Sequence, residues 1–291
     1  MKTFLILFFS SVAFLAAQTM EERYAPLGEL FIYRSAFAPF PHPMRANGRI
    51  YRDRTYSAEE HYRDSSVAIF IPKHFTPAKT TDIVFYLHGH GNNIDKASAQ
   101  FQLIEQFTDA KKNAVFVFPE GAKDAPDSFG GKLEDKDGLK NLLNDVLRFL
   151  KEKKKITSTA IGNIVLVGHS GSYRPMAFCL MRGGVTKNIS DVILFDALYG
   201  QTEKFAYWID HYKGRFINIY TDSGGTKEES ELLMADLEGW GIPYLLNNEQ
   251  DISTSDLLKN RIIFIHSDLT HSGVIMERKQ FQKFLETSRL K

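Results

Sequence analysis

The sequence predicts an α/β protein in which a mostly parallel central sheet is flanked by helices. Two observations lead to this prediction: short, nearly continuous apolar runs recur along the chain, and amphipathic stretches with helical spacing separate them. The apolar runs are typical of strands covered on both faces, and strands that alternate with helices pair in parallel through right-handed crossovers. Ligands of such sheets bind beyond the carboxyl ends of the strands, so the residues that directly follow the predicted strands are the candidates for a functional site.

The composition excludes few functions, but its charge balance limits the classes of partner that we expect. The chain has 291 residues, a formal net charge of +1 at pH 7 and a 43% apolar fraction, which is typical of a globular protein. Because neither sign of charge dominates, we expect no nucleic acid as a partner. The only cysteine, Cys179, lies in an apolar stretch, so it is expected to be a buried, inert thiol.

The first 17 residues have the layout of a secretory signal peptide. A positive start at Lys2 precedes the apolar run Phe4–Ala17, which ends in small residues before the polar Gln18. The run is short for a membrane span, so an uncleaved anchor is the less favoured alternative. We therefore expect a secreted or periplasmic protein with no stable membrane span after signal cleavage.

Residues 18–60 are rich in aromatic side chains and arginine and are interrupted by prolines. We expect an edge strand around Leu30–Tyr33, followed by irregular chain that packs on the core. The arginines are interpreted as a solvated face. Residues 61–291 are predicted to form the main domain.

Within the main domain, each strand is predicted from a short apolar run and each helix from apolar residues repeating on one face. The predicted strands are Val67–Pro72, Asp82–Leu87, Ala114–Pro119, Ile164–Val167, Val192–Phe195, Phe216–Tyr220 and Ile262–Ile265. The predicted helices are Ala97–Phe107, Leu139–Leu150, Arg174–Met181, Phe205–Tyr212, Glu228–Trp240 and Val274–Leu285.

Ser170 is the predicted nucleophile. It is the central residue of Gly168–Ser172 (Gly-His-Ser-Gly-Ser), which joins the strand Ile164–Val167 to a helix with Pro175 in its first turn. Such a turn is tight and strained, so it needs small flanking residues, and it lifts the hydroxyl above the sheet. The helix N-terminus behind the serine favours developing negative charge. A serine instead of glycine at the last position weakens the match slightly, and an ordinary strand–turn–helix serine is the alternative.

A second motif carries a family resemblance. His88-Gly89-His90-Gly91 directly follows the strand Asp82–Leu87, and with the serine turn it makes residues 67–290 resemble the α/β-hydrolase superfamily of esterase- and lipase-like serine hydrolases. The resemblance implies that the backbone N–H groups of His90 and Gly171 bind the oxyanion of an acyl intermediate. A metal pair formed by His88 and His90 is the competing interpretation. Because no further ligand cluster supports it, we expect neither metal nor cofactor.

The resemblance also implies a histidine in a late loop as the general base. His266 and His271 both follow the last predicted strand. His266 continues the apolar run, whereas His271 lies in a loop ahead of the closing helix, which is where this family places its histidine. His271 is therefore favoured.

Two aspartates remain candidates for the acid that orients the histidine. Asp222 follows the strand Phe216–Tyr220, the usual place in the family, and Asp196 follows Val192–Phe195, one strand earlier. Both give the chain order Ser, Asp, His. Asp222 is favoured, with Asp196 as the alternative.

The sequence thus predicts an exported serine hydrolase that cleaves small-molecule or polymer-linked carboxylic esters through an acyl-enzyme. The same residues also suit a serine peptidase, an amidase or an acyltransferase. A third possibility is a hydrolase-fold protein that binds a ligand without turnover.

Overall fold

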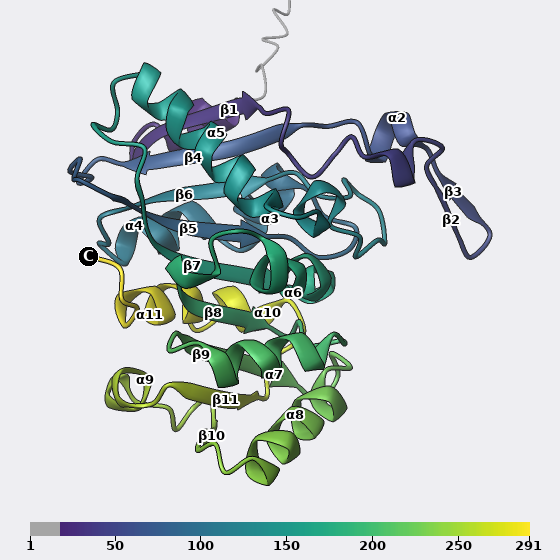
Figure 1. Cartoon of the computed structure of the whole chain (residues 1–291), viewed down its shortest axis with the longest axis vertical. Coiled ribbons are helices and arrows are strands. Elements are labelled where there is room, and N and C mark those ends of the chain that lie inside the picture. The colour runs from purple at the N-terminus through teal and green to yellow at the C-terminus, as the bar shows by residue number, and fades with distance from the viewer. Residues whose placement is uncertain (1–17) are drawn as a thin grey trace, which may run out of the picture.

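A nine-stranded sheet organises the computed structural model, which describes residues 18–291 (Figure 1). The predicted signal peptide, residues 1–17, lies outside the described residues. In spatial order the strands are β1 (Gly28–Arg34), β4 (Ser66–Pro72), β6 (Ala114–Pro119), β5 (Thr81–Leu87), β7 (Ile161–His169), β8 (Ile189–Phe195), β9 (Arg215–Thr221), β11 (Ile262–Ser267) and β10 (Leu245–Asn248).

In this spatial order the strands from β6 to β10 run parallel, and β1 points in the same direction; only β4, which lies between β1 and β6, is antiparallel to its neighbours. The predicted mostly parallel sheet is therefore confirmed. Strand β10, at the other edge, was not predicted from the sequence. Its residues Leu-Leu-Asn-Asn are half polar, and their side chains alternate between partly buried and exposed. Because an edge strand has one unpaired side, it lacks the continuous apolar run that marks the central strands.

Helices cover both faces of the sheet (Figure 1). One face is covered by α5 (Gly138–Glu152), α6 (Tyr173–Arg182), α7 (Thr202–His211) and α8 (Lys227–Gly239). The other is covered by α1 (Met20–Tyr24), α3 (Ile94–Gln100), α4 (Leu103–Asp109), α9 (Thr254–Lys259), α10 (Gly273–Met276) and α11 (Gln280–Glu286). Successive residues of β7 alternate between the two cores: Leu166 packs in one and Val165 in the other.

Two helices predicted as continuous are each divided in two. The segment 97–107 breaks between α3 and α4 at Gln102, and the segment 274–285 breaks between α10 and α11 at Lys279. Both residues have left-handed backbone, with φ of 48° and 53°. A left-handed residue ends the hydrogen-bond ladder of a helix, and side-chain periodicity does not register it.

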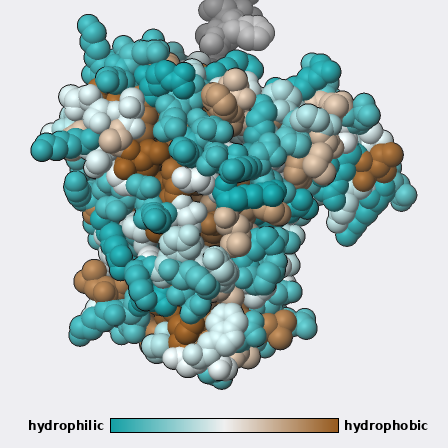
Figure 2. Space-filling view, viewed as in Figure 1, coloured by the Kyte–Doolittle hydropathy of each residue, from teal (hydrophilic) through white to brown (hydrophobic). Residues whose placement is uncertain are grey.

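The N-terminal segment, residues 18–60, is divided into a part that packs on the body and a part that projects from it. Helix α1 and strand β1 join the body, whereas the following chain forms η1 (Pro43–Arg45), α2 (Ala58–His61) and a hairpin of β2 (Arg49–Tyr51) and β3 (Arg54–Tyr56). Figures 1 and 2 show this arm standing away from the body at one end of the strands. At its base, Phe40, Tyr56 and Tyr62 pack with residues of the loop 121–131 in a separate small core.

The carboxyl ends of the parallel strands meet at one edge of the sheet. There β5 ends before His88, β7 before Ser170 and β8 before Asp196. The loops after β9 and β11, which carry Asp222 and His271, reach the same edge. Among residues 18–291, no helix is long and apolar enough to cross a membrane.

Candidate active site

Ser170 lies at the sharp turn between β7 and α6, with a left-handed φ of 56°. A non-glycine residue rarely adopts this backbone conformation, because the conformation costs free energy. Residues that keep such a conformation are concentrated at functional sites. The loop after β5 presses on the turn, because a Cβ added to Gly89 would lie 2.5 Å from the Cβ of Ser170. Only glycine fits at position 89, so the loop backbone lies directly against the serine.

The serine at the last position of the motif has a structural explanation. The Ser172 hydroxyl is buried and donates to the carbonyl of His169 at 2.9 Å. A Cβ at Gly168 would lie 2.2 Å from both the Ser172 hydroxyl and the sulfur of Met176. Ser172 therefore fills the space beneath the turn, and the departure from glycine is compatible with the tight bend.

His271 is paired with Asp196. Its Nδ1 lies 2.7 Å from Oδ2 of Asp196, whose side chain is fully buried, while one third of the His271 side chain is exposed. A carboxylate only accepts hydrogen bonds, so Nδ1 carries the proton and Nε2 is left free to accept one. This is the tautomer that a general base requires.

The buried Asp196 carboxylate is held by hydroxyl groups from the next loop. The hydroxyls of Thr221 and Thr226 both donate to it, the former at 2.8 Å. A Cβ at Gly224 would lie 1.6 Å from Oδ2, so the loop backbone lies directly against the carboxylate. Burial raises the pKa of Asp196, but the hydrogen bonds from His271, Thr226 and Thr221 outweigh it and leave the pKa below its usual value.

Asp222, the aspartate favoured from the sequence, is not paired with His271. Its carboxylate is exposed and lies 3.0 Å from Nζ of Lys227 and 3.1 Å from Nε2 of His266. The preference for Asp222 is thus corrected in favour of Asp196, the alternative. The reason is that the loop after β9 turns its backbone and threonines toward Asp196 and directs Asp222 to the outer side, where His266 also lies.

His169 and Tyr199 both contact His271. His169 precedes Ser170, its Nε2 lies 3.0 Å from the carbonyl of His271, and the two imidazole rings are 4.7 Å apart. Tyr199 lies on the other side: its ring is 6.3 Å from that of His271, and its phenol donates to the carbonyl of Gly224. Burial raises the pKa of Tyr199 to about 12, and the neighbouring Ser170 hydroxyl opposes this rise.

His169 is a buried neutral histidine. Its Nε2–H donates to the His271 carbonyl, while Nδ1 has no hydrogen-bond partner among the described residues. Burial, followed by the proximity of His271, lowers the pKa of His169 to about 4. The ring also packs edge-on against Phe101 at 5.0 Å, so it supports the turn without titrating near neutral pH.

The two predicted oxyanion donors lie next to each other. Gly171 is the second residue of the short helix η3 (Ser170–Ser172), and its N–H belongs to the first turn, where amides have no partner within the helix. A Cβ at Gly171 would lie 2.3 Å from the ring of His90, so the two residues are in contact. The His90 N–H has no acceptor within residues 18–291, and its ring Nε2 lies 2.7 Å from the Ser128 hydroxyl.

His88 makes a buried pair that the sequence did not reveal. Its Nε2 lies 3.0 Å from Oε1 of Glu120, and both side chains are at least 96% buried. Burial lowers the pKa of His88, but the hydrogen bond and charge of Glu120 outweigh it and raise the pKa above its usual value. His88 and His90 therefore have different partners, and the described residues hold no group of three potential metal ligands.

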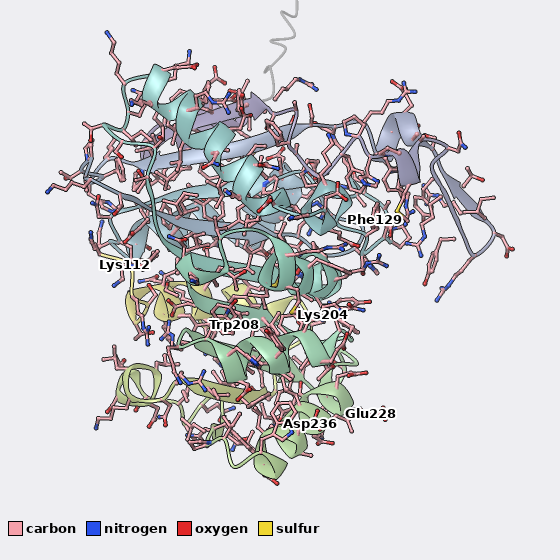
Figure 3. All side chains as sticks on the ribbon, in the orientation of Figure 1. Lys112, Phe129, Lys204, Trp208, Glu228 and Asp236 are labelled. Atoms are coloured by element: carbon pink, nitrogen blue, oxygen red, sulfur yellow. The ribbon has the colours of Figure 1, made fainter. Side chains whose placement is uncertain are left out.

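Several neighbours of the site have structural contacts. Arg174 forms a two-pronged ion pair with the buried Glu134, at 2.7 and 2.8 Å. Phe129, labelled in Figure 3 near the base of the projecting arm, lines a cavity of about 30 Å³ next to Gly171. That volume is enough for about one water molecule. Cys179 is buried, and burial raises the pKa of its thiol, as expected for an inert cysteine.

Sequence reasoning missed Glu120, Thr221 and Thr226. Glu120 is the first residue after β6, the neighbour of β5, just as His88 is the first after β5. Polar residues one step beyond two adjacent strands are a usable signal, but only once the strand order is known. The threonines stand at the end of β9 and the start of α8, and nothing local marks them as partners of Asp196.

Comparison with known proteins shows the fold. No family model and no curated protein matches the chain. Among solved structures, a mutant feruloyl esterase module from Clostridium thermocellum complexed with sinapinate has a TM-score of 0.52 at 15% identity, covering 89% of this chain and 93% of the module. S-formylglutathione hydrolase (FrmB) from Staphylococcus aureus has a TM-score of 0.50 at 9% identity, covering 89% and 98%.

A third structure is FphF, a fluorophosphonate-binding serine hydrolase of Staphylococcus aureus with substrate bound. It has a TM-score of 0.50 at 8% identity, covering 88% of this chain and 97% of its own. At such identities the similarity concerns the fold alone. The resemblance seen in the sequence is confirmed at that level.

Proposed function

We propose that this chain, which has the α/β-hydrolase fold, is an exported serine hydrolase that cleaves carboxylic esters through an acyl-enzyme. The observation that carries the proposal is the left-handed Ser170 together with the His271–Asp196 pair, which contacts His169, the residue before Ser170. Strain at a serine is retained where the surrounding structure imposes it, and such positions concentrate at active sites.

The reaction follows from the tautomer of His271. Nε2 of His271 accepts the proton as Oγ of Ser170 attacks the ester carbonyl, and a tetrahedral intermediate forms. The N–H groups of His90 and Gly171 stabilise its oxyanion. The carbon–oxygen bond to the alcohol then breaks, and the imidazolium gives its proton to the leaving oxygen. Water repeats the sequence on the acyl-enzyme, releasing the acid and free Ser170.

Asp196 acts on His271 rather than on the substrate. Its buried carboxylate accepts from Nδ1 and stabilises the imidazolium that forms in each step. The threonine hydroxyls donate to the same carboxylate and keep it ionised inside the protein. No step in this mechanism needs a metal or an organic cofactor.

Two further points concern substrate and location. The structural neighbours include a feruloyl esterase module solved with sinapinate and an S-formylglutathione hydrolase. Their names favour ester-type over amide substrates for this chain. Export is inferred from the layout of residues 1–17. Amino-terminal sequencing of the protein recovered outside the cytoplasm should begin near Gln18; a mature chain that begins at Met1 contradicts export by cleavage.

Labelling with a fluorophosphonate tests the nucleophile. The purified protein should form a covalent adduct at Ser170, and Ser170→Ala should not. A panel of p-nitrophenyl esters and aminoacyl anilides then separates ester from amide hydrolysis, with ester turnover expected to dominate. Folded protein that neither labels nor turns over any ester contradicts the proposed function and favours a binding role.

A further inference from the structure

The peptide between Gly89 and His90 carries one of the two oxyanion donors, and within residues 18–291 neither its C=O nor its N–H bonds to another backbone group, although the next N–H, that of Gly91, donates to the carbonyl of Ala125 at 3.0 Å. Its N–H belongs to His90, and the residue before it is a glycine, which can adopt more backbone conformations than any other residue. Gly91, two residues on, has a left-handed φ of 65° and no atoms within 4 Å of an added Cβ. A donor in such a loop stabilises an oxyanion only if the peptide is fixed in one orientation.

The side chain of His88 fixes this peptide. Its Nδ1 lies 2.7 Å from the carbonyl oxygen of Gly89, and because a carbonyl only accepts, Nδ1 is the donor. The Gly89–His90 peptide is trans, so its C=O and N–H point in opposite directions across one plane. Holding the carbonyl against His88 therefore turns the His90 N–H to the opposite side.

Glu120 holds the ring of His88 from its other edge. Oε1 lies 3.0 Å from Nε2 of His88, the backbone N–H of Gly121 is directed at the same nitrogen at 3.0 Å, and Oε2 accepts from the backbone N–H of Ile94, at the start of α3, at 3.2 Å. Gly121 closes the space behind the ring, since an added Cβ would lie 2.8 Å from Nε2. The imidazole is thus fixed at both nitrogens and has no free rotation.

We propose that the buried His88–Glu120 pair is a positioning pair that holds the Gly89–His90 peptide with its N–H directed at the oxyanion of the acyl intermediate. This inference rests on the proposed function. His88 and Glu120 touch neither substrate nor the reacting atoms. They act through the backbone of the loop after β5; Glu120 acts on the Gly89–His90 peptide through His88, and it also holds the far end of the loop through the N–H of Ile94.

Two variants and a matched control test the proposal. Glu120→Gln keeps a hydrogen bond, because its amide N–H donates to Nε2 of a neutral His88, and it should stay within about threefold of the wild-type kcat. The double variant His88→Phe with Glu120→Gln removes the donor to Gly89 without leaving a buried unpaired charge. It should lower kcat about 10- to 100-fold with KM nearly unchanged, since losing an oxyanion donor outright costs about 10²- to 10³-fold.

The matched control is Asp191→Asn. Asp191 is a fully buried carboxylate that pairs with Arg215 at 2.7 Å near the opposite ends of the strands. It should lower the melting temperature and leave kcat unchanged. A trifluoromethyl ketone, whose adduct with the serine carries an oxyanion, separates positioning from lost stability: its Ki should rise in the double variant by the factor that kcat/KM falls, and not in Asp191→Asn.

A structure of the double variant gives a readout that needs no turnover. The Gly89 carbonyl should leave its wild-type orientation; if the peptide stays in place, or kcat equals that of the control, the positioning role is refuted. If the double variant does not fold, Glu120→Ala replaces it, and it should lower kcat about tenfold. Wild-type protein that fails to label with fluorophosphonate refutes the proposed function, whereas the peptide orientation still decides the role of His88.

Discussion

Nδ1 of His271 lies 2.7 Å from Oδ2 of Asp196, although 75 residues separate them along the chain. The contact joins a one-third exposed imidazole to a carboxylate without solvent access. In such an arrangement the imidazole is accessible to a substrate, whereas the carboxylate is shielded from water. This shielding strengthens the electrostatic attraction between the imidazole and the carboxylate.

Asp196→Asn should lower kcat about 10³- to 10⁴-fold without unfolding the protein. An amide can donate to Nδ1 and so select the tautomer with its proton on Nε2, which cannot accept a proton from Ser170. The matched variant Asp222→Asn, at the exposed carboxylate beside Lys227, should keep kcat within about twofold. Hydrolysis of p-nitrophenyl esters measures both; equal losses in the two variants would contradict the assignment of Asp196.

Gly224→Ala should lower kcat and stability together. The new methyl group would have to occupy a place 1.6 Å from Oδ2 of Asp196, so either the carboxylate or the loop must move. A displaced carboxylate misaligns His271, and we expect a loss of about 10- to 100-fold in kcat. Gly239→Ala is the control, because nothing lies within 4 Å of its added Cβ at the end of α8. A Gly224→Ala variant with full activity would show that this loop does not fix Asp196.

Ser170→Gly should be more stable than Ser170→Ala. Both variants lack the hydroxyl and should be inactive, but only alanine keeps a Cβ at a φ of 56°. A non-glycine residue in this region costs about 1–3 kcal/mol, offset partly by the greater freedom of glycine in the unfolded chain. A melting temperature about 2–4 °C higher for the glycine variant is the expected result. Equal melting temperatures would mean that the turn stores no strain.

Acidification should destabilise the protein through His169. Its pKa is about 4 in the folded chain and about 6.5 when unfolded, so the unfolded state binds more protons between these values. The contribution of the neutral ring is complete above pH 6.5, falls as the pH drops, and is lost near pH 4, by roughly 3 kcal/mol in all.

Urea unfolding at pH 7.5 and pH 5 measures this loss. His169→Gln keeps an N–H for the His271 carbonyl and cannot titrate, so its stability should fall less between the two pH values than that of the wild type. Identical pH dependence in both proteins would show that His169 is not the titrating group.

The predictable parts of this protein were those encoded locally. The central strands are continuous apolar runs, and the turn around Ser170 needs small residues at fixed positions, so both could be predicted without knowing the strand order. The choice between Asp196 and Asp222 could not. Both follow a strand at the same edge, and the difference lies in which one receives the hydroxyls of Thr221 and Thr226.

The same limit explains the remaining errors. The breaks at Gln102 and Lys279 arise from left-handed backbone at residues that are ordinary helix formers, so periodicity predicted continuous helices. The role of Glu120 depends on β6 lying beside β5, which sequence order alone does not state. In each case the missing information was a tertiary contact rather than a weak local signal.

The close approach of Gly89 to Ser170 also limits how this protein can acquire new substrates. No side chain fits at position 89, and a Cβ at Gly171 would collide with His90. Almost no substitution at these two positions is therefore expected to be tolerated. Variation in specificity has to come from the surrounding loops, such as those bearing Tyr199 and Phe129. A laboratory selection for altered ester preference should therefore accumulate changes around those loops and leave the two glycines untouched.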